Sequence, residues 1–363
     1  MPTKVTAWIL SFLSIFFIWG LNAQPNPIPE TRGSPYGETV PDKYGTWPTE
    51  EFEKGKAPLW LFPNVRKAMI GLNGFLIGGS RTDSFLVLHK GKLVYERYYN
   101  GYGKDTPHFM ASVTKSVTSA LVGVAIGEGY ITSVKDKVVD YFPEARESPQ
   151  WQESKANMTI EHVLTMTSGI LCDTGEKWEW FNGDGVMDTA LNAFLIPQSA
   201  APGKKFMYEN AAPSILLGIV ERATGHKLLD YAQEKLFGPL GMTSVVWDEA
   251  EDDLPFGAFG ISMTPRDMAR FGYLYLNYGR WDDQQIIPAD YVAVTPPRAM
   301  RSRAYGYMFW NFNLEPFRGF YQADGALGQY IIIMPSRDTV IVRTGDRGPV
   351  DHVIARISGF LGL

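Results

Sequence analysis

The fold of this chain is decided by residues 110–131, MASVTKSVTSALVGVAIGEGYI. Their apolar side chains recur at helical spacing, which predicts a helix over about 112–129. The predicted helix opens on Ser112-Val113-Thr114-Lys115, the only S-x-x-K sequence in the chain. Residues three apart share a helix face and helical side chains lean toward the N-terminus, so Lys115 is expected to lie back against Ser112.

Such a pair suits nucleophilic catalysis, because a serine hydroxyl needs a base within hydrogen-bonding reach. A free lysine has a pKa of about 10.4, so Lys115 must lose about three units to act as a base near neutral pH. Burial, neighbouring cations and the positive end of the helix dipole all favour that change. The alternatives are that Ser112 is a simple N-cap and that Lys115 is a solvated helix residue.

A second polar group stands just before a helix predicted to begin near Ala211. Tyr208-Glu209-Asn210 places a phenol and an amide two residues apart on a loop, where both can point to one spot. The phenol suits a proton donor or acceptor, and the amide suits a group that holds a substrate carbonyl. The alternatives are that Tyr208 packs its ring, as one of 18 tyrosines, and that Asn210 is an N-cap.

Strand patterns occur near both ends of the chain. Residues 85–99, FLVLHKGKLVYERYY, contain two β-rich runs around residues 89–92, which indicates a hairpin. Further strands are predicted over 305–312, 329–334 and 339–343, and a final amphipathic helix over about 350–360. Residues from 159 to about 290 show mostly helical patterns that are broken by Gly and Pro.

These patterns predict an α+β fold. One antiparallel sheet is built from both ends of the chain and flanked by helices, and a mostly helical domain is inserted between them. We assign 61–130 and 295–363 to the sheet domain and 131–294 to the inserted domain. Residues 24–60 are rich in Pro and Gly in their first half and are expected to form an extended leader.

The N-terminus has the pattern of a secretory signal peptide over residues 1–23. Lys4 precedes an apolar run, residues 8–21, that ends before the small-residue pattern Leu21-Asn22-Ala23. The run is shorter than the ~20 residues that span a bilayer. We therefore expect an exported protein, periplasmic or secreted, with no stable membrane anchor after cleavage; the alternative is an uncleaved anchor. Cys172 is the only cysteine, which excludes an internal disulfide.

Composition narrows the partners and the chemistry. The net charge is -5 and Lys and Arg do not cluster, which argues against nucleic-acid binding. The five histidines lack the spacing of metal ligands, so neither a metal nor another cofactor is expected. The chain has no G-x-S-x-G sequence, so an α/β-hydrolase is unsupported. His108 precedes Ser112 by four residues, and we expect it to be structural.

Five segments together resemble the β-lactamase-related serine hydrolases, over residues 80–362. This family includes class C β-lactamases, DD-peptidases, β-lactamase-fold esterases and 6-aminohexanoate-oligomer hydrolases. The segments that carry the resemblance are residues 110–131 quoted above, IEHVLTMTSGI (160–170), PGKKFMYENAAPSILLGIVERATG (202–225), GAFGISMTPRDMARFGYLYLNYGRW (257–281) and ADGALGQYIIIMPSRDTVIV (323–342).

The resemblance implies a β-lactamase/DD-peptidase-like fold and a role for each matching residue. Ser112 would be the acylated nucleophile, Lys115 would activate it and share protons with Tyr208, and Asn210 would orient the substrate. The third motif of the family, K-T-G or H-T-G, is matched here by Ala323-Asp324-Gly325. Gly325 would let the substrate approach closely, and the backbone N–H groups of Ala326 and Ser112 would form the oxyanion hole.

The third motif is also where this chain departs from the family. Ala323 stands in place of the residue that helps hold a substrate carboxylate, and Asp324 adds a negative charge. True β-lactam or D-Ala-D-Ala substrates are therefore disfavoured. Arg343, Arg347 or His352 would have to compensate from nearby, although the simpler expectation is that each is a surface residue.

The sequence thus predicts a serine hydrolase that acts through an acyl-enzyme on small amide or ester substrates. One alternative is a D-alanyl peptidase or weak β-lactamase. Another is a binding or sensor protein that keeps the fold and turns over poorly. The sequence leaves the oligomeric state open.

Overall fold

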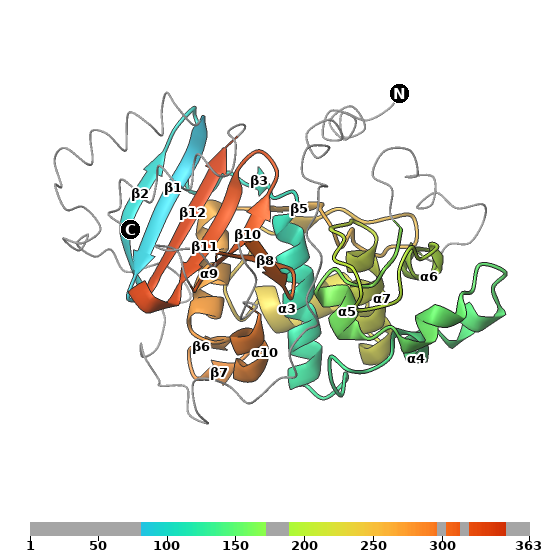
Figure 1. Ribbon diagram of the computed structural model, residues 1–363. Helices are drawn as coiled ribbons and strands as arrows, with labels where there is room; N and C mark the ends of the chain where they lie inside the picture. The colour runs from blue at the N-terminus through green and yellow to red at the C-terminus, as the bar shows by residue number, and fades with distance from the viewer. Residues whose placement is uncertain (1–80, 172–188, 296–302, 313–318, 346–363) are drawn as a thin grey trace.

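The structure, a computed structural model, describes residues 81–171, 189–295, 303–312 and 319–345. Its main feature is a seven-stranded sheet in the order β2-β1-β12-β11-β10-β9-β8, with antiparallel neighbours throughout (Figure 1). The strands are β1 (Thr82–His89), β2 (Lys92–Tyr98), β8 (Arg303–Gly306), β9 (Phe309–Phe312), β10 (Phe320–Gly325), β11 (Gln329–Met334) and β12 (Thr339–Gly345).

The sheet joins the two ends of the described chain. β1 pairs with β12, so that Phe85 lies opposite Arg343. β1 and β2 form the hairpin predicted around residues 89–92, and Lys90 and Gly91 take positive φ angles at its turn. The predicted α+β fold, with one antiparallel sheet built from both ends of the chain, is confirmed.

Residues 305–312 were predicted as one strand, and this prediction is wrong. The chain reverses at Tyr307 and Met308, with φ of 42° and 64°, and forms the hairpin β8–β9. Other segments hold the turn: Met308 N–H donates to Leu164 O at 3.0 Å, and Ser116 Oγ donates to Met308 O at 2.7 Å. Because the turn depends on these distant partners and its two central residues are Tyr and Met, the sequence carries only a weak turn signal, Gly306.

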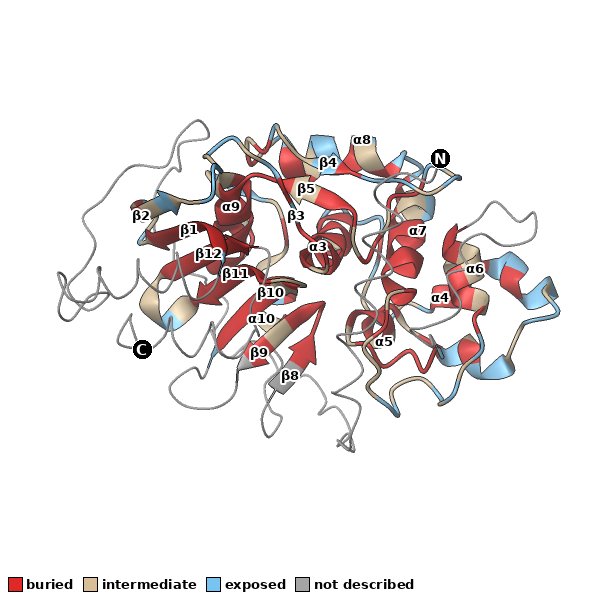
Figure 2. Cartoon of the chain, turned by 90° about the horizontal axis from the view of Figure 1, so that it is seen from above, coloured by how far each residue is buried: buried red, intermediate tan, exposed pale blue. Residues whose placement is uncertain are grey.

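Helices α3 (Val113–Gly127) and α9 (Pro265–Leu276) pack against the sheet. α3 contacts β10 and β11, and α9 contacts β1, β11 and β12. The contact of α9 is close at Gly272, where an ideal Cβ would lie 2.6 Å from Val340 and 2.7 Å from Ile331. α3 also contacts α7, so it stands between the sheet and the helical part of the molecule (Figure 2).

The helices away from the sheet gather around α7 (Ala212–Thr224), which packs against α3, α4, α5 and α6. These helices are α4 (Val138–Tyr141), α5 (Ile160–Leu164), α6 (Thr189–Leu195) and α8 (Leu228–Ala232). Short 3-10 helices are Pro143–Glu147, Glu153–Asn157 and Pro335–Arg337, and Gln233–Phe237 is a π-helix. α7 begins at Ala212, which agrees with the start predicted near Ala211.

Part of the segment 131–294, predicted as a helical insertion, lies with the sheet. α9 belongs to this segment but makes its main contacts with β1, β11 and β12. α10 (Ala289–Val294) also approaches α3, since Tyr291 OH lies 2.9 Å from Ser119 Oγ. The chain therefore returns to the sheet at α9, before residue 294.

Two small sheets complete the described elements. β5 (Ile261–Met263) pairs with β3 (His108–Phe109) on one side and with β4 (Val246–Trp247) on the other. β6 (Arg280–Trp281) and β7 (Gln284–Gln285) form the second pair. Because β3 directly precedes Ser112, its pairing with β5 helps to fix the start of α3.

Several sequence predictions lie outside the described residues. They are the signal peptide (1–23), the leader (24–60), Cys172 and the helix over 350–360. Among the residues that the structure describes, none of the helices has both the length and the hydrophobicity that a bilayer crossing needs.

Gly272→Val tests the packing of α9 on the sheet. The added side chain overlaps methyl groups of Val340 and Ile331, so we expect a loss of about 1–3 kcal/mol of unfolding free energy. Chemical denaturation of the purified variant measures this loss. Gly103→Ala is the control, because the nearest heavy atom to its new Cβ is 3.8 Å away. Equal stability of both variants would contradict the close contact.

Candidate active site

Ser112 stands at the N-cap position of α3, with φ of -70° and ψ of -4°. Within the described residues its side chain makes no capping hydrogen bond. Instead, Ser112 Oγ lies 3.0 Å from Lys115 Nζ. The preceding residue, Ala111, has a φ of 47°, a conformation that costs free energy for any residue with a Cβ. The chain therefore holds Ser112 in a strained turn and leaves its hydroxyl to Lys115.

Lys115 is fully buried, which excludes the alternative of a solvated helix residue. Its ammonium donates to Ser112 Oγ at 3.0 Å, to Asn210 Oδ1 at 2.7 Å and to Ala258 O at 3.1 Å. These three acceptors match the three N–H donors of a protonated lysine. A buried ammonium requires such partners, because each unmet donor would cost desolvation free energy.

The same geometry orients a neutral Lys115. A neutral amine keeps two N–H donors, and Asn210 Oδ1 and Ala258 O can only accept. They therefore hold both donors and leave the nitrogen lone pair directed at Ser112 Oγ. In this state the Ser112 hydroxyl donates the hydrogen bond to Lys115 Nζ, the arrangement that a serine nucleophile requires of its base.

Asn210 and Tyr208 reach Lys115 from the loop before α7. The N-cap of α7 is Ala211, so the alternative that Asn210 is an N-cap is wrong. Asn210 Oδ1 instead accepts from Lys115, and the ammonium lies 5.0 Å from the centre of the Tyr208 ring. The structure thus brings together Ser112, Lys115, Tyr208 and Asn210, four residues that the sequence singled out.

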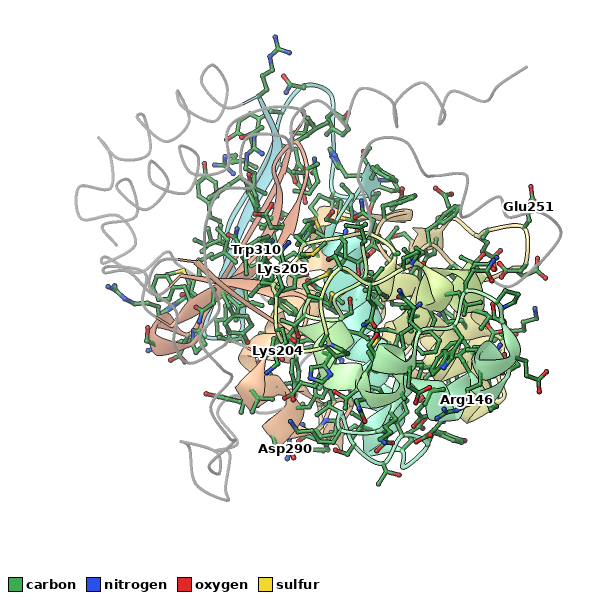
Figure 3. The ribbon with its side chains drawn as sticks, turned by 45° about the vertical axis from the view of Figure 1, so that its right-hand side comes forward. Arg146, Lys204, Lys205, Glu251, Asp290 and Trp310 are labelled. Carbon is green, nitrogen blue, oxygen red and sulfur yellow. The ribbon has the colours of Figure 1, made fainter. Side chains whose placement is uncertain are left out.

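Tyr208 also packs against aromatic neighbours. Its ring stacks on Trp310 with centroids 5.4 Å apart, and meets Tyr305 edge to face at 5.6 Å. Phe206 contacts the same two rings. In Figure 3, Trp310 and Lys205 are labelled close together, where the loop before Tyr208 meets β9. The rings fix the direction of the Tyr208 phenol and leave a half-buried aromatic wall at Trp310.

Glu209, between Tyr208 and Asn210, is buried and was given no role from the sequence. Its carboxylate accepts from Ala211 N–H at 2.6 Å and from Ala212 N–H at 2.9 Å. Burial raises the pKa of this carboxyl to about 7, although the two backbone hydrogen bonds and the charge of Lys115 oppose the rise.

The loop that carries Ala258 packs between α7 and α3. An ideal Cβ on Gly257 would lie 2.5 Å from the backbone of Pro213 in α7. On the other side, Thr118 Oγ1 of α3 donates to Gly257 O at 2.9 Å. The carbonyl of Ala258 is therefore held in place next to Lys115. Sequence reasoning missed it, since any residue can present a backbone carbonyl.

β10 approaches the nucleophile at Gly325. An ideal Cβ there would lie 2.2 Å from Met110 O, two residues before Ser112, so only glycine allows this contact. The pairing of β9 with β10 runs from Phe320 to Gln322, and Gly325 lies beyond it. Ala326 follows directly and begins the turn to β11, where Leu327 and Gly328 have positive φ. This geometry places Gly325 beside the segment that leads into Ser112.

The first two residues of the third motif, Ala323 and Asp324, lie on opposite faces of β10. Ala323 is buried and lies on the same face as Gly325. Asp324 is half-buried on the other face, where its Oδ2 accepts from Gln322 Nε2 at 3.0 Å. Its charge helps to raise the pKa of the Tyr305 phenol, after the larger effect of burial. Ala323 thus places an apolar side chain on the face that approaches the nucleophile.

Arg343 is not a surface residue, and that expectation is wrong. It is fully buried in β12, where Nε donates to Thr82 Oγ1 at 3.0 Å and NH1 donates to Gly328 O at 2.6 Å. Arg343 therefore supports the turn between β10 and β11. Arg347 and His352 lie outside the described residues.

His108 lies in β3, and its contacts are with the sheet. Its Nε2 is 3.2 Å from Thr344 Oγ1, and its ring stacks on Tyr102 at 4.3 Å. Burial lowers the pKa of this imidazole. Among the described residues, no group of three or more His, Cys, Asp or Glu could hold a metal ion.

This geometry agrees with comparisons to known proteins. The model of a family described as beta-lactamase matches residues 73–357. The chain belongs to the beta-lactamase family. It is a β-lactamase-fold hydrolase, as the resemblance of the five segments implied.

Two curated proteins and one solved structure are similar to the chain. It is 26% identical to the 6-aminohexanoate-dimer hydrolase of Paenarthrobacter ureafaciens over 287 residues, 72% of each chain. It is 31% identical to esterase EstB of Burkholderia gladioli over 163 residues, 41% of each chain. A class C beta-lactamase solved in complex with cefoxitin shares the fold, with a TM-score of 0.64 and 17% identity over 83% of this chain and 99% of that one.

Gly325→Ala tests the contact between β10 and the nucleophile in this β-lactamase-family chain. The new Cβ overlaps Met110 O, so β10 must move away from Ser112. We expect at least a tenfold slower hydrolysis of a p-nitrophenyl ester, because small displacements in an active site are costly. Stopped-time assays measure the rate, and Gly103→Ala serves as the control. Unchanged hydrolysis by Gly325→Ala would show that the contact has no part in catalysis.

Proposed function

We propose that this protein is a serine hydrolase that cleaves small amide or ester substrates through an acyl-enzyme on Ser112. One observation carries the proposal: a fully buried lysine, Lys115, contacts Ser112 Oγ while two fixed acceptors hold its other donors. A surface N-cap serine and a solvated lysine would have none of these features. The arrangement is that of an activated nucleophile.

In the first step, Ser112 Oγ attacks the substrate carbonyl as its proton passes to Lys115 Nζ. The carbonyl oxygen becomes negatively charged, and the backbone N–H groups of Ser112 and Ala326 are proposed to stabilise it. The bond to the leaving amine or alcohol then breaks, and the leaving group takes a proton from Lys115 or Tyr208. The acyl group remains on Ser112 as an ester.

In the second step, water hydrolyses this ester. Lys115 or Tyr208 takes a proton from the water as it attacks, and that proton returns to Ser112 Oγ as the acid leaves. Tyr208 suits a proton carrier, because Trp310 and Tyr305 fix its ring beside the Lys115 ammonium. The cycle restores the enzyme and adds one water to the substrate.

The residues of the third motif on β10 favour neutral amides and esters over substrates that are held by a carboxylate. Ala323 offers no charge where the family motif has a cation, and it lies on the same face of β10 as Gly325. The names of two relatives agree with amide or ester bonds, since one is a 6-aminohexanoate-dimer hydrolase and another an esterase. We propose the same amide or ester chemistry for this chain.

We also propose that the protein is exported to the periplasm or secreted. The apolar run over residues 8–21 and the following Leu21-Asn22-Ala23 support this location. Expression with and without residues 1–23, followed by fractionation and N-terminal sequencing, tests it. Retention of the full chain in the cytoplasm would contradict export.

A fluorophosphonate probe tests the nucleophile. We expect the purified protein to be labelled at Ser112, as located by mass spectrometry, because the probe reacts with activated serines. Ser112→Ala should lose the label, and Lys115→Met should slow labelling by about 10²–10⁴-fold, the usual contribution of a general base. Ser133→Ala, outside the site, should label like the wild type. Labelling elsewhere, or none, would refute the proposed mechanism.

Substrate panels then separate the candidate activities. We expect turnover of p-nitrophenyl esters or of a 6-aminohexanoate dimer, and weak or no acylation by a labelled penicillin. Rapid acylation and turnover of penicillin would favour a D-alanyl peptidase or β-lactamase instead. Stable Ser112 acylation without turnover of any substrate would favour a binding or sensor protein.

A further inference from the structure

Glu209 is a buried acid in the centre of the site that the reaction scheme above does not use. It is 1% exposed, and its backbone lies between the two residues whose side chains approach Lys115. A buried carboxylate is costly unless hydrogen bonds or charges stabilise it. Its contacts therefore indicate what it does there.

The first contact is with the N-terminus of α7. The N-cap residue there is Ala211, whose side chain has no acceptor for the free N–H groups of the first turn. Glu209 supplies one: Oε2 accepts from Ala211 N–H at 2.6 Å and from Ala212 N–H at 2.9 Å, and Oε1 accepts from Ala212 N–H at 3.0 Å. This clamp folds the loop back on the helix, with Tyr208 and Asn210 on either side.

The second interaction is with charge. Lys115 on α3 attracts the Glu209 carboxylate, and the effect is mutual, so an ionised Glu209 favours the protonated form of Lys115. Tyr305 on β8 also senses this carboxylate: burial raises the pKa of its phenol, and the charge of Glu209 adds to the rise. Tyr208 and Asp324 act on the same phenol. Glu209 therefore interacts electrostatically with Lys115 on α3 and with Tyr305 on β8.

We propose that Glu209 is a positioning residue for the reaction at Ser112: its carboxylate clamps α7 to hold Tyr208 and Asn210 against Lys115, and its negative charge controls how readily Lys115 releases its proton. This inference rests on the proposed serine hydrolase mechanism. It assigns a function to the middle residue of the Tyr-Glu-Asn triplet.

The pH dependence of activity tests the charge effect. Glu209→Gln keeps the shape and an acceptor oxygen but removes the charge, so Lys115 releases its proton more readily. We expect the acid limb of the kcat/KM profile for a p-nitrophenyl ester to move to lower pH by at least about half a unit. Glu209→Ala also removes the clamp, and we expect kcat to fall by at least about tenfold more than in Glu209→Gln, with a smaller change in KM.

Asp252→Asn is the matched control. Asp252 also accepts from the N-terminal turn of a helix, with Oδ2 2.6 Å from Thr189 N in α6, but this helix end is not at Lys115. We expect Asp252→Asn to lower the melting temperature and to leave the kcat/KM profile in place. If Glu209→Gln and Asp252→Asn have the same pH profile as the wild type, the charge effect is refuted.

A stability measurement tests Glu209 without any turnover. The pKa of this carboxyl is about 7 in the folded protein and 4.5 is its ordinary value, so between these pH values the folded state holds a proton that the unfolded state releases. Glu209 therefore costs the wild type stability as pH rises from about 4.5 through 7. Relative to wild type, Glu209→Gln should gain melting temperature between pH 5 and pH 8.5.

The two measurements separate this inference from the proposed function. A pH-independent difference in melting temperature, with normal labelling of Ser112, would overturn the inference about Glu209 and leave the hydrolase standing. If the melting temperatures of Glu209→Gln and wild type differ in a pH-dependent way but Ser112 is not labelled and no substrate is turned over, Glu209 is a buried acid with no role in a reaction. Shifts in both measurements support the inference as stated.

Discussion

The active site depends on one physical constraint, the burial of the Lys115 ammonium. A buried cation needs an acceptor for every N–H, and three separate segments supply them: the start of α3 through Ser112, the loop before α7 through Asn210, and the loop before β5 through Ala258. The hydrogen bond to Lys115 Nζ constrains the position of each of these segments. Elements of the sheet side and of the helical side therefore meet at Lys115, and Ser112, the proposed nucleophile, is one of the acceptors named above.

The close packing around this point leaves room for glycine alone at two positions. Gly257 lies against the backbone of Pro213, and Gly325 lies against Met110 O. The nucleophile itself follows Ala111, whose positive φ stores strain that the surrounding contacts must offset. Short backbone contacts near Ser112 therefore position this residue.

The sequence was a good guide where a local pattern has a local cause. The α3 helix, the β1–β2 hairpin and strands β11 and β12 follow from periodicity and turn residues, and the family resemblance named four side chains that do converge. It failed where distant contacts decide. The turn at Tyr307 and Met308 is held by Leu164 and Ser116, and neither of these two turn residues is of a type that signals a reversal. Arg343, expected on the surface, is buried because the turn between β10 and β11 accepts its hydrogen bond.

By itself, the sequence determined the α+β class, the family and the candidate nucleophile with its lysine, because these depend on residue types at fixed spacing along the chain. Only the tertiary structure decided that Lys115 is buried, that Asn210 serves it in place of capping α7, and that Glu209 caps the helix beside it. The reason is physical: burial and hydrogen-bond choice depend on which distant atoms come within about 3 Å of a polar group, and spacing along the chain does not contain that information.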